Sequence, residues 1–318
     1  MKLRTVLGGA LGAVGATILG DRLLRRRAGD LEPALRGVDG TYRWRGFDVA
    51  YTEAGDPDDP DALLVHGISA ASSSREFSEV FESLSKSHHV VAVDLPGFGR
   101  SDRPPLLYSA SLYETFVADA IDDLVETPTV VASSLSGAYV ASAARETDVD
   151  SLVLVCPTDE TMGDSPRAWV RTLVRSPVVG AGLFDLLVSK PGLRYFHRDH
   201  GYADMAKLTD ETVDYQWRSA HQPGARYAPA SFLGGFLDPD TDPESVLADL
   251  TVPVTLIWGS DADITPVAAG RDLARAGDAR LLVFDDAKLL PHVEHPNAFV
   301  DVLTGEFEDT ESAVLDSD

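Results

Sequence analysis

Short apolar segments, rich in Val, Leu and Ile, recur along this chain with helical stretches between them. We expect strands at about residues 62–66, 89–93, 128–132, 151–155, 253–258 and 280–284. Strands that alternate with helices in this way form a parallel sheet with helices on its faces. The sequence therefore predicts an α/β fold with a mostly parallel central sheet flanked by helices. Residues 41–45 and 48–53 add an antiparallel hairpin at its start.

One of these strands leads directly into a serine. Residues 130–137 read Val-Val-Ala-Ser-Ser-Leu-Ser-Gly, which indicates a buried strand, a tight turn and the start of a helix. Such a turn needs small neighbours, because its backbone is strained and the helix packs close to the strand. Counting along the strand places Ser134 at the bend, with Ser136 as the alternative.

This turn resembles the nucleophile elbow of the α/β-hydrolase superfamily, G-x-S-x-G, with Ala132 and Ser136 at the usual glycine positions. The resemblance extends over about residues 41–303. Residues 94–101, Asp-Leu-Pro-Gly-Phe-Gly-Arg-Ser, are similar to the D-x-x-G-x-G-x-S signature of the same superfamily. The resemblance implies an α/β-hydrolase fold with an inserted helical cap and with Ser134 as the nucleophile.

The strand near residue 64 ends in His66-Gly67-Ile68, which resembles the H-G-x turn of the superfamily. The resemblance implies that the N–H groups of Ile68 and Leu135 form an oxyanion hole, while His66 and Gly67 shape the pocket. The motifs suggest neither a metal site nor a cofactor, because the chain has no C-x-x-C or H-E-x-x-H pattern and no dinucleotide-binding glycine loop.

The acid and the base of the expected triad are out of register. The usual acid position falls on Ala262, between Asp261 and Asp263, and the usual base position falls on Leu289. A serine hydroxyl is a poor nucleophile unless a base accepts its proton and a third group orients that base. We therefore expect His292 as a displaced base, with Asp261 or Asp263 as the acid.

Other residues could replace the missing groups. His200 and His221 lie in the expected cap and could reach into the pocket. Asp159 follows the strand at residues 151–155, from which some superfamily members supply the acid. Its alternative interpretation is a loop residue that caps the next helix.

Two functions remain compatible with these motifs. The first is a serine hydrolase that acts on a small, apolar ester or acyl compound through Ser134, assisted by a displaced histidine and aspartate. The second is a non-catalytic α/β-hydrolase-like protein that binds an apolar ligand or lipid, as the substitutions Ala262 and Leu289 suggest. The sequence does not specify the substrate, since members of one superfamily share a scaffold and differ in their sites.

The composition is strongly acidic. Fifty-one Asp and Glu residues stand against 27 Lys and Arg residues, which gives a formal net charge of −24. At molar salt the Debye length falls to about 3 Å, so the self-repulsion is screened. We interpret the charge as a halophilic surface. Its spread through the loops also argues against nucleic acid as a partner.

The N-terminus differs from the rest of the chain. Residues 6–20 carry no charge, with Lys2 and Arg4 before them and Arg25-Arg26-Arg27 after them. The stretch is short for a membrane span, and a signal peptide is the alternative. Arginines directly after the apolar stretch favour retention of the main domain on the cytoplasmic side. We expect residues 1–27 to associate with the membrane surface.

We expect five parts in the chain. The cap should contain helices near residues 169–174, 182–188 and 212–220, broken by prolines at 177, 191, 223 and 229. The parts are an apolar N-terminal segment (1–27), a linker (28–40), the core (41–156 and 250–304), a helical cap (157–249) and an acidic tail (305–318).

Overall fold

A computed structural model describes residues 19–160 and 165–306. Within them, eight strands form one sheet in the order β1-β2-β4-β3-β5-β6-β7-β8. β2 is antiparallel to β1 and β4, and the neighbours from β4 to β8 are parallel. The strands are β1 (Val38–Trp44), β2 (Phe47–Ala54), β3 (Asp61–Val65), β4 (His89–Val93), β5 (Thr129–Ser133), β6 (Ser151–Val155), β7 (Val254–Gly259) and β8 (Arg280–Phe284).

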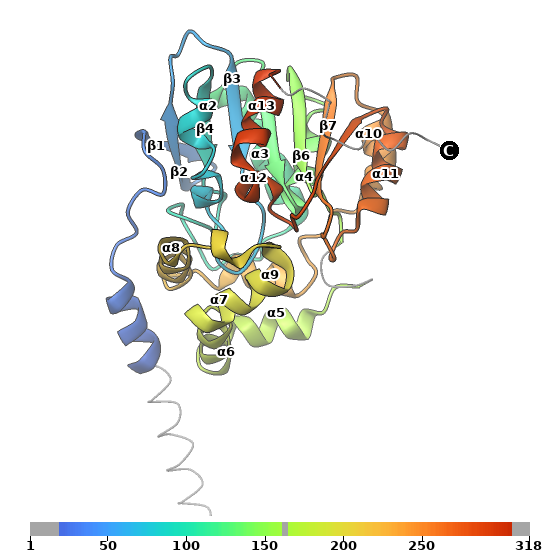
Figure 1. Cartoon of the computed structure of the whole chain (residues 1–318). Helices are drawn as coiled ribbons and strands as arrows, with labels where there is room; N and C mark the ends of the chain where they lie inside the picture. Colours follow the sequence, from blue (N-terminus) through green and yellow to red (C-terminus); the bar gives the residue numbers. More distant parts are fainter. Residues whose placement is uncertain (1–18, 161–164, 307–318) are drawn as a thin grey trace, which may run out of the picture.

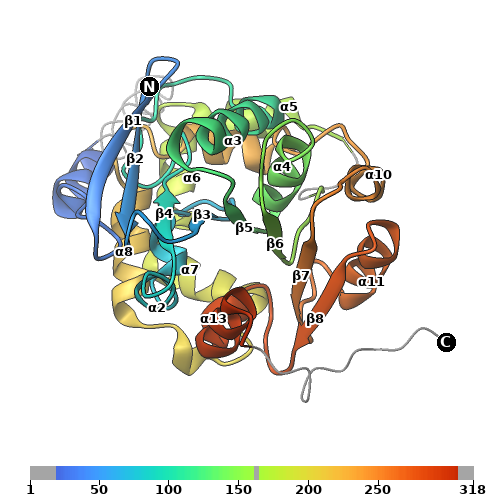
Figure 2. The ribbon, with the colours of Figure 1, turned by 90° about the horizontal axis from the view of Figure 1, so that it is seen from above.

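Helices cover both faces of this sheet (Figure 1, Figure 2). α3 (Ala110–Leu124), α4 (Leu135–Ala143) and α11 (Val267–Ala276) pack on one face, and α2 (Phe81–Leu84) and α13 (Pro296–Thr304) on the other. The short helices η1 (Ser74–Phe77) and α12 (Pro291–Glu294) lie beside the carboxyl ends of the strands. The predicted α/β-hydrolase fold and all six predicted parallel strands are confirmed, with bounds that differ by at most one residue.

A helical cap covers the carboxyl ends of the strands (Figure 1). It has a small apolar core of its own, which includes Val174, Phe184 and Val213. The cap elements are α5 (Ala168–Arg175), α6 (Val179–Leu187), α7 (Lys190–Phe196), the π-helical turn η2 (His197–Gly201), η3 (Met205–Lys207), α8 (Asp210–Ala220) and α9 (Tyr227–Leu233).

The expected cap helices are present, but two more were missed and one boundary is misplaced. Pro191 and Pro229 lie in the first turns of α7 and α9, where the missing N–H has no intrahelical partner, so they start helices instead of breaking them. α10 (Pro243–Ala248) packs on α4 and α11 and belongs to the core. The cap therefore ends near residue 233, before the predicted residue 249.

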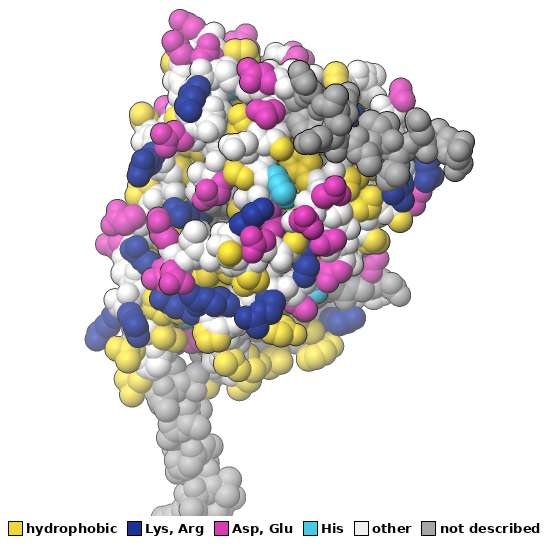
Figure 3. All heavy atoms as spheres, in the orientation of Figure 1, with side chains coloured by type: hydrophobic (Ala, Val, Ile, Leu, Met, Phe, Trp, Pro, Cys, Tyr) yellow, Lys and Arg dark blue, Asp and Glu magenta, His cyan; other side chains and the backbone are white. Residues whose placement is uncertain are grey.

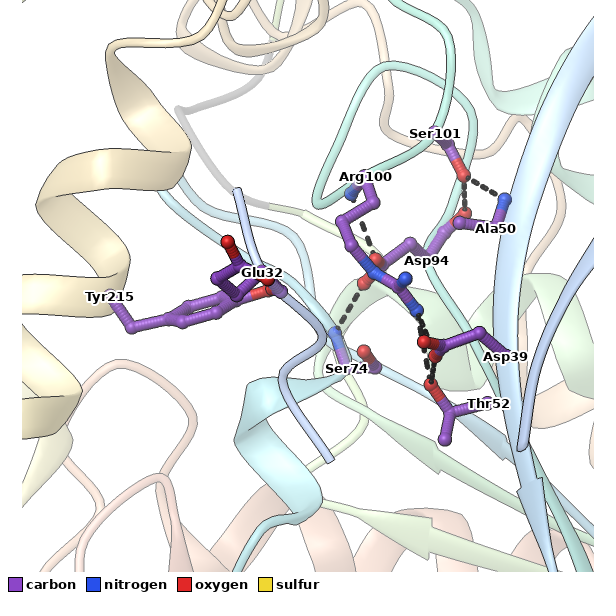
Figure 4. A network of polar contacts seen from close by, with 9 residues as sticks. All are labelled: Glu32, Asp39, Ala50, Thr52, Ser74, Asp94, Arg100, Ser101 and Tyr215. Atoms are coloured by element: carbon purple, nitrogen blue, oxygen red, sulfur yellow. Dashed lines mark hydrogen bonds and ion pairs between the residues drawn. The ribbon is translucent and has the colours of Figure 1, made fainter. Parts of the chain in front are cut away.

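The predicted linker also differs from the structure. β1 begins at Val38, and Ala34 and Leu35 are buried against the core, so residues 28–40 form no free linker. The hydroxyl of Tyr215 donates to the carbonyl of Glu32 at 3.1 Å and ties this segment to the cap (Figure 4). A helix is present at residues 19–28, and most of the expected membrane segment and of the acidic tail lies outside the described residues. In the described part of the chain, no helix has the length and apolar character to cross a membrane.

Candidate active site

Ser134 lies at the bend between β5 and α4. Its φ of 54° and ψ of −132° are strained for a residue with a side chain. Its N–H donates to the carbonyl of Val155 at 2.8 Å, and its own carbonyl accepts from Gly137 at 2.9 Å, so both neighbouring elements hold the strained turn. The side chain is half-buried and lines a cavity beneath the cap.

The alternative nucleophile has a structural role. Ser136 is fully buried, and its hydroxyl donates to the carbonyl of His66 at 2.7 Å. His66 in turn accepts from the N–H of Leu95 at 3.0 Å through Nε2, so its Nδ1 carries the proton that it donates to the carbonyl of Gly67 at 2.7 Å. These bonds fix the turn after β3 against the elbow, and His66 lies outside the cavity lining.

Two backbone amides are available beside Ser134. Ile68 follows the turn after β3 and lines the cavity, and Leu135 begins α4 directly after the serine. Among the described residues, neither N–H donates to another protein group. Gly67 lies so close to the elbow that a Cβ there would come within 3.4 Å of Ser134 Cβ. The arrangement is suited to stabilising an oxyanion that forms at Ser134.

The cavity beneath the cap has a volume of about 100 Å³. Its wall combines the turn after β3, the elbow, the π-helical turn and the loop before α12. The polar side chains among its lining residues are those of Ser69, Ser72, Ser73, Arg75, Glu76, Ser78, Glu79, Ser133, Ser134, His197, Tyr202, Lys207, Thr212 and Gln216.

The position at which the resemblance places the base holds Leu289. This side chain lines the cavity together with Leu290 and Val293. Within residues 19–160 and 165–306, Ser134 Oγ makes no hydrogen bond to any side chain. The structure does not bring His292 to the serine, because this residue is fully buried between the rings of Phe77 and Phe299.

His292 instead faces a buried carboxylate. Its Nε2 lies 3.3 Å from Oε1 of Glu76, and Oε2 of Glu76 accepts from the N–H of Gly67 at 3.1 Å. Burial raises the pKa of Glu76, but the imidazole of His292 and the hydroxyl of Ser133 outweigh this effect and leave the pKa below its ordinary value. Glu76 therefore brings a negative charge to the cavity wall at neutral pH.

A loop network holds Glu76 in this place. Asp94, at the end of β4, accepts from the N–H of Ser74 at 2.7 Å and from that of Arg100 at 2.8 Å (Figure 4). Ser74 begins η1, the turn that carries Glu76, and Ser101 donates to the carbonyl of Asp94. Asp94 thus braces the loop after β4, and it also positions the carboxylate of Glu76.

The predicted acids lie outside the cavity. Asp261 and Asp263 are exposed, and Ala262 between them is buried. Asp263 approaches Nδ1 of His200 at 3.2 Å, so the structure brings these two residues together, but away from Ser134. The other two alternative residues also lie outside the cavity. Nε2 of His221 lies 3.9 Å from Oδ1 of Asp185, and Asp159 lines a separate depression beside α4.

One cap histidine that no sequence motif indicates does line the cavity. His197 is 6% exposed, and its Nε2 lies 2.8 Å from Oε1 of Gln216. An amide oxygen only accepts, so Nε2 carries the proton and Nδ1 holds a lone pair. Nδ1 is buried without a partner, beside Gly201, whose absent Cβ would lie 2.6 Å away. A π-helical turn begins at His197, and such turns often occur at functional sites. The sequence gives no indication of this turn.

The electrostatics of His197 favour its neutral form. Burial lowers the pKa of His197, and the hydrogen bond to Gln216 and the charge of Glu76 oppose only part of this effect.

The chain also offers no metal centre in the described residues, where no group of three or more His, Cys, Asp or Glu side chains is placed to hold an ion.

Comparisons with known proteins agree with this architecture. Pimeloyl-[acyl-carrier protein] methyl ester esterase of Aromatoleum aromaticum is 31% identical over 247 residues, which cover 74% of this chain and 94% of the esterase. An uncharacterised protein of Mycobacterium tuberculosis is 25% identical over 313 residues, which cover 92% of this chain and 89% of that protein. A membrane phospholipase A has the same fold, with a TM-score of 0.68, 21% identity and coverage of 96% of this chain and 94% of the phospholipase. The model of the alpha/beta hydrolase family matches residues 62–302, and the chain belongs to this family.

Proposed function

We propose that the protein is a serine hydrolase that cleaves a small, apolar ester or related acyl compound through Ser134. The observation that carries the proposal is the strained elbow, which presents a serine with an unengaged hydroxyl to a cavity beside two unengaged N–H groups. A positive φ at a residue with a side chain costs about 1–3 kcal/mol and persists where the surrounding structure enforces it. Here the hydrogen bonds to Val155 at the end of β6 and from Gly137 in α4 do so.

His197 is the proton acceptor that fits this site. It lines the same cavity as Ser134, its pKa is lowered, and its Nδ1 lone pair has no partner in the protein. Transfer of the serine proton to this nitrogen, directly or through one water molecule, requires the cap to stay closed over the elbow. Glu76 stabilises the imidazolium that results, because its negative charge favours protonation of His197.

The chemistry has two steps. Ser134 Oγ attacks the acyl carbon as its proton passes to His197, and the amides of Ile68 and Leu135 stabilise the oxyanion. The intermediate collapses as the leaving alcohol takes the proton, which leaves an acyl group on Ser134. Water then attacks the acyl carbon, again with His197 as the proton acceptor, and the acid is released as Ser134 regains its proton.

The small volume and the apolar part of the lining support an acyl substrate of modest size with an apolar group. Leu289, Leu290, Val293 and Phe196 supply an apolar wall near the serine, and the cavity is small. Relatives that are named as pimeloyl-[acyl-carrier protein] methyl ester esterases cleave esters, which supports the ester class. A non-catalytic binding protein is the second proposal, because Leu289 and Ala262 replace two members of the usual triad.

Hydrolysis of short p-nitrophenyl esters in molar KCl tests the first proposal. We expect Ser134→Ala to abolish turnover, since the acyl group then has no acceptor on the protein. Ser72→Ala is the matched control, because Ser72 lines the same cavity and is expected to be dispensable. Turnover that survives in Ser134→Ala would contradict the proposal, and ester binding without turnover in the unchanged chain would favour the binding protein.

We expect the rate to depend on pH through His197. A general base must be neutral, and the lowered pKa keeps His197 neutral down to a pH below its ordinary value of 6.5. The plot of kcat/KM against pH should therefore be flat near pH 7 and fall only below pH 6.5. In His197→Ala we expect a loss of about 10²-fold or more and no such fall. His221→Ala, another buried cap histidine, serves as control, and an unchanged profile in His197→Ala would place the base elsewhere.

A further inference from the structure

Exposed apolar side chains gather at one end of the molecule. Thirteen large hydrophobic residues are exposed in the described part of the chain, and eleven of them lie on α5, α6, α7, residues 106–107 and the helix at 19–28. The most exposed of these is Leu186, at 71%. It is followed by Trp169 at 69% and by Leu23 and Tyr195 at 67% each. We call this the cap face. Figure 3 shows hydrophobic side chains along this end, with a row of Lys and Arg side chains beside them.

The charge of this end is opposite to that of the whole chain. Residues 19–28 and 165–233 contain thirteen Lys and Arg against seven Asp and Glu, a net charge of +6. The complete chain carries −24. An anionic surface is therefore attracted to the cap face, whereas the acidic remainder of the protein repels it.

The helix at residues 19–28 is fixed to the cap. Arg218 Nε donates to the carbonyl of Ala28 at 2.9 Å, and Gln222 donates to that of Gly29 at 2.9 Å. Asp21 and Arg25 share a depression with Ala181 on α6. Residues 6–20, which directly precede the charged part of this helix in the sequence, carry no charge and consist of apolar residues, Gly and Thr. In the sequence, this apolar segment thus runs directly into a helix that belongs to the cap face.

We propose that the cap face docks on an anionic lipid bilayer, with the side chains of α5 and α6 in the interface and the arginines at the phosphates. The combination of exposed Trp and Leu with basic residues on one face is typical of interfacial membrane contacts. A second copy of the chain fits less well, because a contact between two such faces would leave the arginines of both without anionic partners. At molar salt the apolar contacts carry the docking, since the Debye length is about 3 Å.

Docking in this way brings the cavity close to lipid. Phe196 is 42% exposed on the cap face and also lines the cavity that contains Ser134. A ligand that leaves the bilayer would meet this edge of the cavity first. The docking itself does not depend on hydrolysis at Ser134, so it is tested separately.

Tryptophan quenching by lipid tests the proposal on the full chain. Vesicles of phosphatidylglycerol and phosphatidylcholine that carry a nitroxide on the acyl chain quench a side chain only where it enters the interface. Trp44 and Trp258 are buried and Trp217 is half-buried, so Trp169 is the exposed reporter. We expect strong quenching in molar KCl that is mostly lost in Trp169→Phe. We also expect Leu186→Asp to reduce it, whereas Val38→Asp, at an exposed apolar residue on β1, leaves it unchanged.

Two results would overturn the proposal. Equal quenching of the unchanged chain and of Trp169→Phe, or no quenching in either, would show that the cap face stays in water. A lipid-free dimer that Leu186→Asp dissociates, with a blue-shifted Trp169 emission in the absence of vesicles, would assign the face to a second copy of the chain.

Discussion

The double variant Leu289→His, Ala262→Asp is expected to hydrolyse p-nitrophenyl esters about 10²-fold faster than the unchanged chain, or more. These two positions are the usual places of the base and the acid. Leu289 already lines the cavity with Ser134. Ala262 is buried after the end of β7, and the N–H of the preceding Asp261 donates to the carbonyl of Ala287, in the loop that leads to Leu289. An imidazole at position 289, oriented by a carboxylate, would accept the serine proton more directly than a cap residue does.

The matched control for this gain is Leu290→His, Ala262→Asp. Leu290 lines the same cavity one residue further along. This variant therefore introduces the same imidazole and carboxylate, but with the imidazole out of register. We expect little or no gain from it. Equal rates in the two double variants, or no gain in the first, would mean that Ser134 is not presented for attack.

The thermal midpoint of unfolding is expected to rise by roughly 10 °C between ~0.1 M and ~3 M KCl, which corresponds to about 6 kcal/mol for a domain of this size. The net charge of −24 makes the folded state repel itself at low ionic strength, and salt screens this repulsion. Calorimetry or far-UV circular dichroism measures the midpoint.

A non-ionic osmolyte distinguishes the screening of charges by salt from the exclusion of a cosolute from the protein surface. Sucrose is excluded from protein surfaces and favours compact states, but it screens no charge. We expect sucrose at matched water activity to give a much smaller rise than KCl. A midpoint that does not change with KCl would contradict the halophilic interpretation of the acidic surface.

The sheet and the elbow were predictable because their signals are local. The apolar runs have the length and spacing of buried strands, and a serine between a strand and a helix, as in residues 130–137, requires one backbone conformation. The proline-containing helices α7 and α9 were not predicted. From the sequence, a proline inside a helix cannot be told from a proline in its first turn unless the start of the helix is known.

The proposed base, His197, was harder to predict, because its position depends on how the cap folds over the sheet. His292 lies close to the expected register, but the aromatic rings of Phe77 and Phe299 and the carboxylate of Glu76 hold it in the core. His197 is remote from every motif in the sequence and reaches the cavity only through the π-helical turn. The contact of Asp263 with His200 likewise joins residues from separate parts of the chain.

The most direct test of the account is covalent labelling of the full chain by a fluorophosphonate in molar KCl. This reagent traps an activated serine as a stable phosphonyl ester, and mass spectrometry of the intact chain and of its peptides locates the adduct. We expect one adduct on Ser134, which is absent in Ser134→Ala, retained in Ser72→Ala and formed more slowly in His197→Ala. A correctly folded chain that forms no adduct, or an adduct on another serine, would contradict the assignment of Ser134 as the nucleophile.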